Sequence, residues 1–247
     1  MSKPSIRFAD RISNLPPYLF AELDKLRDRK RAEGVDVISL GIGDPDLPTP
    51  TQVIDALEVA ARDPENHRYP EYYGLDALRE AISAWYKRRF EVTLDANTEI
   101  VPLIGSKEGI AHLPLALINP GETVLVTDPG YPVYTIGTML AGGVSHTLPL
   151  SPSSNWLPDL ESIPSDVLSN ARLLWLCYPG NPTAAVAPFG FFETAIDFAR
   201  AHGLVLAQDA AYSEVVYDNY RCRSILEIPG ARDVAVEFHS LSKTYNM

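Results

Sequence analysis

The chain has 247 residues, a formal net charge of -11 at pH 7 and 46% hydrophobic residues. It is long enough to bury a substantial core, and it shows no long apolar span and no basic N-terminal signal, which argues against a membrane or secreted protein and for a cytoplasmic one. The acidic balance argues against a nucleic-acid partner, and the two cysteines and five histidines lack disulfide or metal-ligand spacing, so no metal site is predicted.

Helical and strand patterns alternate along the chain. A charged amphipathic helix is predicted from Pro17 to Glu33, and a loop rich in glycine and proline from Gly41 to Pro50. Further helices are predicted at about 51–62, 75–90, 106–118 and 189–202, and short apolar strands near 123–127, 144–148, 172–177, 204–208 and 234–238. This alternation predicts an α/β fold, a mainly parallel sheet between two helical layers, with ligands at the carboxyl ends of the strands.

The run Ser240-Leu-Ser-Lys243 directly follows the last predicted strand. A lysine among hydroxyls at the end of a buried strand is what a pyridoxal phosphate (PLP) enzyme needs, because its amine condenses with an aldehyde while O–H and N–H groups hold a phosphate. Taken alone, the run fits a solvated lysine in a polar turn better. His239, beside it, is interpreted as a packed residue rather than a catalyst.

Two upstream strands end in polar groups that favour a cofactor site. Asn181 lies in a rigid turn after the strand near 172–177, where its amide can point into a crevice, although a plain turn explains it too. Asp209 ends the strand near 204–208, and Tyr212 follows three residues later. A buried aspartate needs a cationic partner, and the alternative is an aspartate that caps the next helix.

A third segment adds an aromatic ring and an anion site. Tyr131 follows the strand near 123–127 in a Pro-Gly turn, which presents its ring. Gly105 and Ser106 open the helix predicted at 106–118, where backbone N–H groups and the helix dipole favour an anion. An ordinary helix N-cap explains Ser106 equally well.

In this order and spacing, the motifs resemble those of the fold-type I PLP enzymes, specifically the class I and II aminotransferases. The resemblance runs from Gly41-Ile-Gly-Asp-Pro-Asp46 to the last residue. It implies that Lys243 binds the PLP aldehyde covalently and that Asp209 pairs with the pyridine nitrogen, and it makes these two residues and Tyr212 the catalytic set.

The resemblance also assigns the remaining cofactor and substrate contacts. Tyr212 and Asn181 would hydrogen-bond the phenolic oxygen of PLP, and Tyr131 would stack on its ring. The phosphate would be held by four groups of this chain: Ser106, the Lys107 amide, Ser240 and Ser242. Tyr69 matches the tyrosine that such homodimers lend to the neighbouring subunit's phosphate. Gly43 and Asn181 would contact the substrate.

The resemblance implies a division of the chain. Residues 1–48 would form an N-terminal arm and small-domain segment, and residues 49–247 the PLP-binding large domain, incomplete at its C-terminus. Family members continue beyond the lysine into a C-terminal small domain that binds the substrate carboxylate, so we expect a fragment of a longer enzyme, or else a truncated and inactive product with exposed apolar surface. Ala184 replaces the glycine that usually follows Asn-Pro-Thr.

For the substrate, the loop at 41–50 and the segments at 63–67 and 105–110 resemble those of bacterial LL-diaminopimelate aminotransferases. This implies amino transfer with 2-oxoglutarate in lysine biosynthesis. Three alternatives stay open: an aspartate- or alanine-type aminotransferase, a PLP carbon–sulfur lyase, and a non-catalytic PLP-fold binding module.

Overall fold

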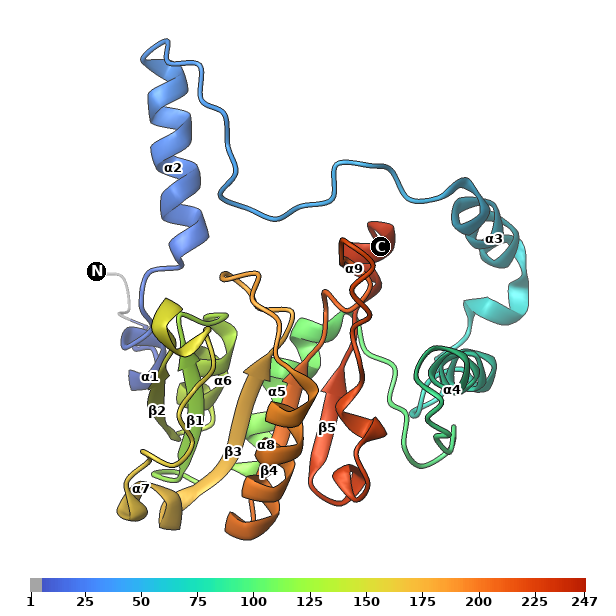
Figure 1. Ribbon diagram of the computed structural model, residues 1–247. Helices are drawn as coiled ribbons and strands as arrows, with labels where there is room; N and C mark the ends of the chain where they lie inside the picture. Colours follow the sequence, from blue (N-terminus) through green and yellow to red (C-terminus); the bar gives the residue numbers. More distant parts are fainter. Residues whose placement is uncertain (1–5) are drawn as a thin grey trace. The chain divides into compact units, whose positions relative to one another are not determined.

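The computed structural model describes residues 6–247 (Figure 1). Contacts divide the chain into two units, residues 1–46 and 47–247, and each is described by itself. The first unit contains α1 (Asp10–Ser13) and α2 (Leu19–Ala32), the latter close to the helix predicted at 17–33. Ion pairs one turn apart, such as Glu22 with Lys25 at 2.7 Å, run along α2. Residues 35–46 have no helix or strand.

The second unit is built on one sheet of five strands in the order β2-β1-β3-β4-β5. The strands are β1 (Thr123–Asp128), β2 (Val144–Pro149), β3 (Ala171–Cys177), β4 (Val205–Asp209) and β5 (Ala235–Phe238). Every neighbouring pair is parallel. The prediction of a parallel α/β fold is therefore confirmed, and each predicted strand is present.

The helices of the second unit include all four that the sequence predicts. These are α3 (Thr51–Arg62), α4 (Asp76–Phe90), α5 (Ser106–Leu117) and α8 (Phe189–His202). Three more were not predicted: α6 (Val133–Leu140), α7 (Ser165–Asn170) and α9 (Leu241–Tyr245). They have eight residues or fewer, too short for a clear helical period. Short 3₁₀ turns complete the unit: η1 (Pro64–His67), η2 (Pro152–Ser154), η3 (Ile225–Glu227) and η4 (Ala231–Asp233).

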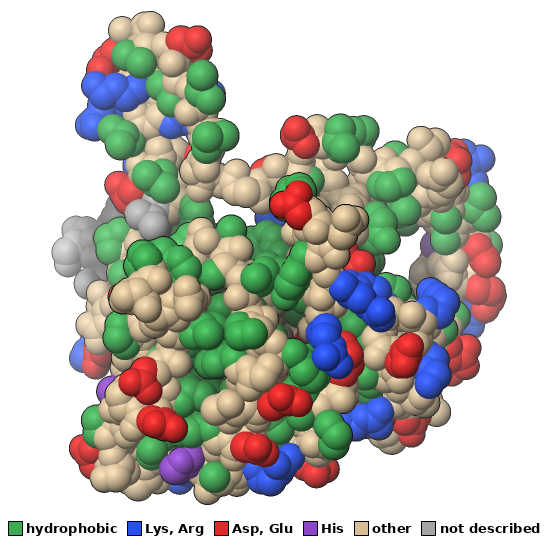
Figure 2. All heavy atoms as spheres, viewed as in Figure 1, with side chains coloured by type: hydrophobic (Ala, Val, Ile, Leu, Met, Phe, Trp, Pro, Cys, Tyr) green, Lys and Arg blue, Asp and Glu red, His purple; other side chains and the backbone are tan. Residues whose placement is uncertain are grey.

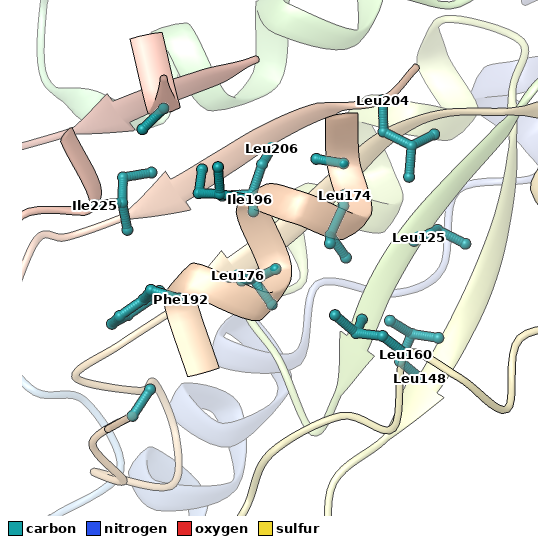
Figure 3. Close-up of a cluster of buried hydrophobic side chains, with 14 of the residues drawn as sticks. Leu125, Leu148, Leu160, Leu174, Leu176, Phe192, Ile196, Leu204, Leu206 and Ile225 are labelled. Carbon is teal, nitrogen blue, oxygen red and sulfur yellow. The ribbon is translucent and has the colours of Figure 1, made fainter. Parts of the chain in front are cut away.

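The central strands are buried on both faces, which explains their continuous apolar runs. On one face, Leu174, Leu176 and Leu206 pack against Phe192 and Ile196 of α8 (Figure 3). On the other, alternate residues of the same strands pack against α5 and α6: Val124, Val126, Leu173, Trp175 and Ala207. Each fully buried leucine contributes about 1.5–3 kcal/mol relative to an exposed one. The three layers thus follow from the period-two alternation of side chains along a strand.

Strands β2 and β5 lie at the two edges of the sheet. Val236 on β5 is 37% exposed, and other large apolar side chains such as Leu57 and Ile104 are more exposed. Figure 2 shows hydrophobic side chains reaching the surface at many points of the face that it displays. These exposures do not test whether the last strand lacks covering partners, which stays a prediction.

Among residues 6–247, no helix combines the length and apolar character that crossing a membrane requires.

Candidate active site

The carboxyl ends of the central strands bring the predicted site residues to one edge of the sheet. In the parallel register, Cys177 at the end of β3 pairs with Asp209 at the end of β4, and Asp209 pairs with Phe238 at the end of β5. The Ala210 N–H donates to the Phe238 carbonyl at 2.8 Å, which ties the next turn to β5. Segments far apart in the sequence therefore supply one site.

Asp209 is a buried acidic residue at the carboxyl ends of the strands, with only 5% of its surface exposed. Its Oδ2 accepts a hydrogen bond from the Tyr134 hydroxyl at 2.8 Å, and its Oδ1 a longer one from the Ala211 amide at 3.4 Å. Burial raises the pKa of Asp209, while Tyr134, the Ala211 amide and the more distant charge of His239 lower it. Residues 211–214 form a turn rather than a helix, so Asp209 is not a helix cap.

Tyr134 is a site residue that the sequence reasoning did not single out. It lies in the first turn of α6 and stacks on Trp175 with ring centroids 4.8 Å apart and an interplanar angle of 10°. Burial is the main cause that raises the pKa of Tyr134 well above its usual value, so its hydroxyl stays a donor to Asp209. The only sequence signal was its position three residues after Tyr131, just inside the start of α6.

Tyr212, Asn181 and Tyr131 lie close enough to influence one another. Burial raises the pKa of Tyr212. The nearby Cys177, Asp209 and Tyr131 raise it further, and the Asn181 side chain lowers it. Asn181 and Tyr212, predicted to share a site, therefore lie near each other. Cys177 is 7% exposed, and burial raises the pKa of its thiol to about 12, as expected of a core residue.

The N-terminus of α5 offers backbone N–H groups at the same edge. Gly105, with φ of 76°, is its N-cap residue and provides no side-chain cap, whereas Ser106 is the first helical residue. Ser106 is therefore not the N-cap. A Cβ at Gly109 would lie 2.7 Å from the Phe238 ring, so glycine lets α5 pack directly on the end of β5. The Lys107 Nζ lies 6.0 Å from the centroid of the Tyr131 ring.

Lys243 lies on α9, immediately beyond β5. Ser240 is the N-cap of this short helix, and its Oγ accepts a hydrogen bond from the Ser242 amide at 3.1 Å. The far end of α9 is held by Asn246, whose carbonyl accepts from Thr49 at 2.7 Å and whose amide donates to Leu47 at 2.9 Å. These bonds fix the turn that carries the lysine and both serines.

Two predicted site residues lie outside the strand ends and helix starts described above. Tyr69, in the segment between η1 and α4, is fully exposed at 101%. Gly43 lies in the first unit, in a segment without helix or strand. Their assigned roles stay predictions.

The donor set fits PLP. Asp209 is a buried carboxylate whose hydrogen-bond partners, Tyr134 and the Ala211 amide, are both neutral, so a cationic ring N–H would complete its environment. The uncapped start of α5 and the hydroxyls of Ser240 and Ser242 suit a phosphate. No cluster of three or more potential metal ligands is found within the described part of the chain.

Comparison with known proteins agrees with this fit. The family model "Aminotransferase class I and II" matches residues 35–247. The LL-diaminopimelate aminotransferase of Aquifex aeolicus is 55% identical over 97% of this chain and 62% of its own length, and that of Desulforudis audaxviator is 56% identical over 97% and 61%.

Among solved structures, substrate-bound BacF from Bacillus subtilis superposes with a TM-score of 0.92 at 37% identity, over 98% of this chain and 61% of BacF. The chain thus spans about 62% of the length of the first of these curated relatives. It belongs to the class I and II aminotransferases, a PLP-dependent family of fold type I.

Proposed function

We propose that the whole protein is a PLP-dependent aminotransferase that moves an amino group between LL-diaminopimelate and 2-oxoglutarate, in lysine biosynthesis. The observation that carries the proposal is the buried Asp209 carboxylate with neutral partners, beside Tyr212 and one strand away from the turn that bears Lys243. The substrate rests on relatives at 53–56% identity that bear the name LL-diaminopimelate aminotransferase.

When bound, PLP supplies an electron sink that stabilises the charge left as a proton leaves the substrate's α-carbon. In this proposal Asp209, as an anion, holds the proton on the ring nitrogen, and Tyr134 keeps the carboxylate in place. Tyr212 and Asn181 hydrogen-bond the phenolic oxygen. Tyr131 supports the ring by stacking.

The phosphate is assigned to the start of α5, through Ser106 and the Lys107 amide, and to Ser240 and Ser242. Helix N–H groups and hydroxyls bind an anion through hydrogen bonds, without a charged side chain. With the phosphate held at the start of α5 and the ring nitrogen held by Asp209, Lys243 would lie near the reactive carbon of PLP. Once the substrate amine has replaced it on the aldehyde carbon, the freed Lys243 amine would take the α-proton and return a proton, as base and acid in turn.

The proposal includes a homodimer with shared sites. Tyr69, fully exposed in the single chain, would reach the phosphate in the neighbouring subunit. Gly43 and Asn181 are proposed to contact the substrate. Residues 1–48 are assigned to the N-terminal arm and small-domain segment, residues 49–247 to the PLP-binding domain, and the protein to the cytoplasm.

The cofactor is tested on the full-length enzyme, meaning a polypeptide that contains this chain at the length of its curated relatives. Borohydride reduction after PLP addition, followed by peptide mapping, should place the adduct on Lys243. Lys107→Ala should keep that adduct and Lys243→Ala should lose it. An adduct on Lys107, or none in the wild type, would contradict the assignment.

The substrate is tested by comparing kcat/KM for LL-diaminopimelate, aspartate and alanine as donors to 2-oxoglutarate. A site that pairs a distal ammonium and carboxylate leaves its own polar groups unsatisfied when a shorter donor binds, so LL-diaminopimelate should be preferred. A preference for aspartate or alanine would reject the lysine pathway but keep the reaction. Pyruvate from cystathionine would indicate a lyase, and PLP binding without turnover a binding module.

A further inference from the structure

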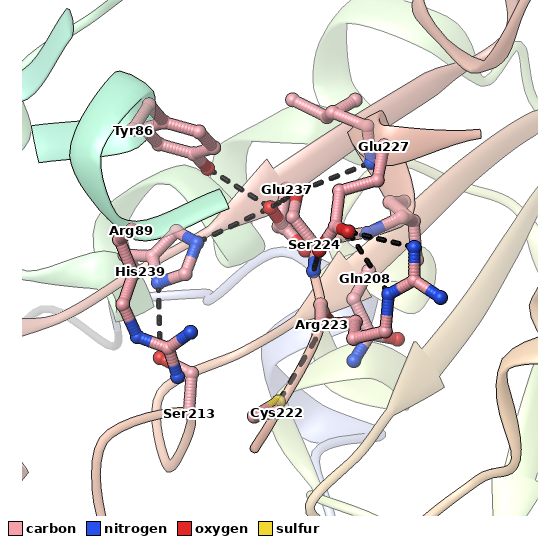
Figure 4. Close-up of polar contacts among 12 residues, drawn as sticks. Tyr86, Arg89, Gln208, Ser213, Cys222, Arg223, Ser224, Glu227, Glu237 and His239 are labelled. Atoms are coloured by element: carbon pink, nitrogen blue, oxygen red, sulfur yellow. Dashed lines mark hydrogen bonds and ion pairs between the residues drawn. The ribbon is translucent and has the colours of Figure 1, made fainter. Parts of the chain in front are cut away.

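A buried polar cluster lies behind the cofactor edge, at the end of β5. Glu237, with a side chain only 1% exposed, accepts hydrogen bonds from Tyr86 at 3.0 Å and from Ser224 at 2.6 Å (Figure 4). The Nε2 atom of His239 lies 3.3 Å from the same carboxylate oxygen. Its Nδ1 atom lies 3.3 Å from the Ser213 hydroxyl. His239 thus bridges β5 and the turn that follows Asp209.

The buried Glu237 carboxylate calls for a cationic partner. Burial raises the pKa of Glu237, but its contacts with His239, Ser224 and Tyr86 outweigh burial and lower the pKa overall. A buried anion needs a cation, and among the described residues His239 is the one basic side chain paired with Glu237. As an imidazolium it would pair with Glu237 through Nε2, at ion-pair distance, and donate through Nδ1–H to Ser213.

The same imidazole lies one residue beyond the strand partner of Asp209. Asp209 is the register partner of Phe238, the residue before His239, and the charge of His239 is one of the influences that favour the ionised form of Asp209. His239 is also the residue before Ser240, which caps α9. The rings of three α4 residues surround it at 5.1–6.1 Å between centroids: Trp85, Tyr86 and Phe90.

We propose that His239 is a positioning residue of the cofactor site: as an imidazolium held between Glu237 and Ser213, it fixes the start of the Ser240–Lys243 turn and presents its positive charge to Asp209. This rests on the proposed function only in taking PLP as the ligand.

Several titratable and charged groups face Asp209 and His239. Around Asp209 they are Tyr134 of α6, Cys177 of β3 and Tyr212 of the following turn. Around His239 they are Glu237, Tyr86 and the ion pair of Arg89 with Glu214 at 2.9 Å.

The test measures the dissociation constant of PLP against pH in the full-length enzyme, from visible absorbance or fluorescence quenching. PLP binds more tightly when Asp209 is an anion, because the anion pairs with the ring N–H, so affinity falls on the acid side as Asp209 takes up a proton. We call the pH range over which the affinity falls the acid limb. His239→Gln keeps polar contacts but loses the charge, so its acid limb should lie about one pH unit higher than that of the wild type, which is the low end of the effect of a nearby charge on a pKa. Below the limb, PLP should bind about tenfold more weakly than in the wild type.

Two further variants make the result specific. Glu237→Gln removes the anion that pairs with the imidazole, so the acid limb of this variant should move in the same direction. This variant decides the question if His239→Gln does not fold. Tyr86→Phe removes a different hydrogen bond to Glu237 and should leave the limb in place. An unmoved limb in both polar variants, an equal shift in Tyr86→Phe, or failure of both variants to fold would overturn the proposal. Absence of PLP binding in the wild type would instead refute the proposed function.

Discussion

The Tyr134→Phe substitution removes one hydroxyl from the candidate site and leaves the ring stacked on Trp175. The lost group is the donor at 2.8 Å to the buried Asp209 carboxylate. A hydrogen bond to a charged group contributes about 1.5–3 kcal/mol, and one to a neutral group about 0.5–1.5 kcal/mol. The cost of the substitution should therefore depend on whether Asp209 is ionised.

The sign of the pH dependence follows from the raised pKa of Asp209. Since its pKa in the folded protein lies above the unfolded value near 3.8, the folded state holds the proton longer, and stability falls as pH rises from about 3.8 through the folded pKa. Removing the Tyr134 hydroxyl raises that pKa further, so the variant continues to lose stability after the wild type has levelled off. The extra loss is about 1–1.5 kcal/mol, close to one pKa unit.

The assay is urea unfolding of cofactor-free protein at several pH values, comparing the wild type with each variant. Tyr178→Phe is the matched control, because the buried Tyr178 hydroxyl donates to a neutral acceptor, the Trp156 carbonyl, at 2.6 Å. Its cost should be about 0.5–1.5 kcal/mol and independent of pH. A cost of Tyr134→Phe that stays flat with pH, or that is no larger than the control's at neutral pH, would refute the reasoning.

Three further predictions concern the site, its neighbouring turn and its assembly. Asp209→Asn should retain PLP in an absorbance titration but lower kcat by about one to three orders of magnitude, because the nearby opposite charge is worth 1–3 pKa units to the ring proton; near-normal turnover would contradict this. Ala184→Gly should raise the free energy of unfolding by about 0.5–1 kcal/mol, because Ala184 has φ of 56° and glycine avoids that left-handed strain at some entropic cost; a lower melting temperature would be the contrary result. Inactive Tyr69→Phe and Lys243→Ala subunits should recover activity when mixed, since one site of each heterodimer would carry neither lesion; without recovery, sites would not be shared.

The sequence was sufficient for the sheet and for its polar strand ends. Runs such as Leu173–Cys177 are apolar because both faces of the strand are covered, and a polar residue at the end of such a run is conspicuous. Because parallel strands end at one edge, Asn181 and Asp209 could be assigned to a single site before any contact was known.

Other parts of the site depend on contacts that no local pattern encodes. The bond from Tyr134 to Asp209 joins residues 75 positions apart, through a helix of only eight residues. His239 was interpreted as a packed residue, and its ring contacts with α4 agree with that. Its pairing with Glu237 was not visible in the sequence, because residues two apart on a strand share a face whether that face is apolar or polar.

The strictly parallel sheet has a consequence for the stability of its functional edge. No tight hairpin joins neighbouring strands there, since each parallel connection runs through a long crossover. A ligand bound by the turns after β3, β4 and β5 would therefore connect the strand ends directly, whereas the backbone connects them only through the long crossovers. At 100 times its dissociation constant, such a ligand adds about 2.7 kcal/mol to the folded state. Amide exchange in those turns should slow most on binding, so cofactor loss would loosen this edge before the centre of the sheet.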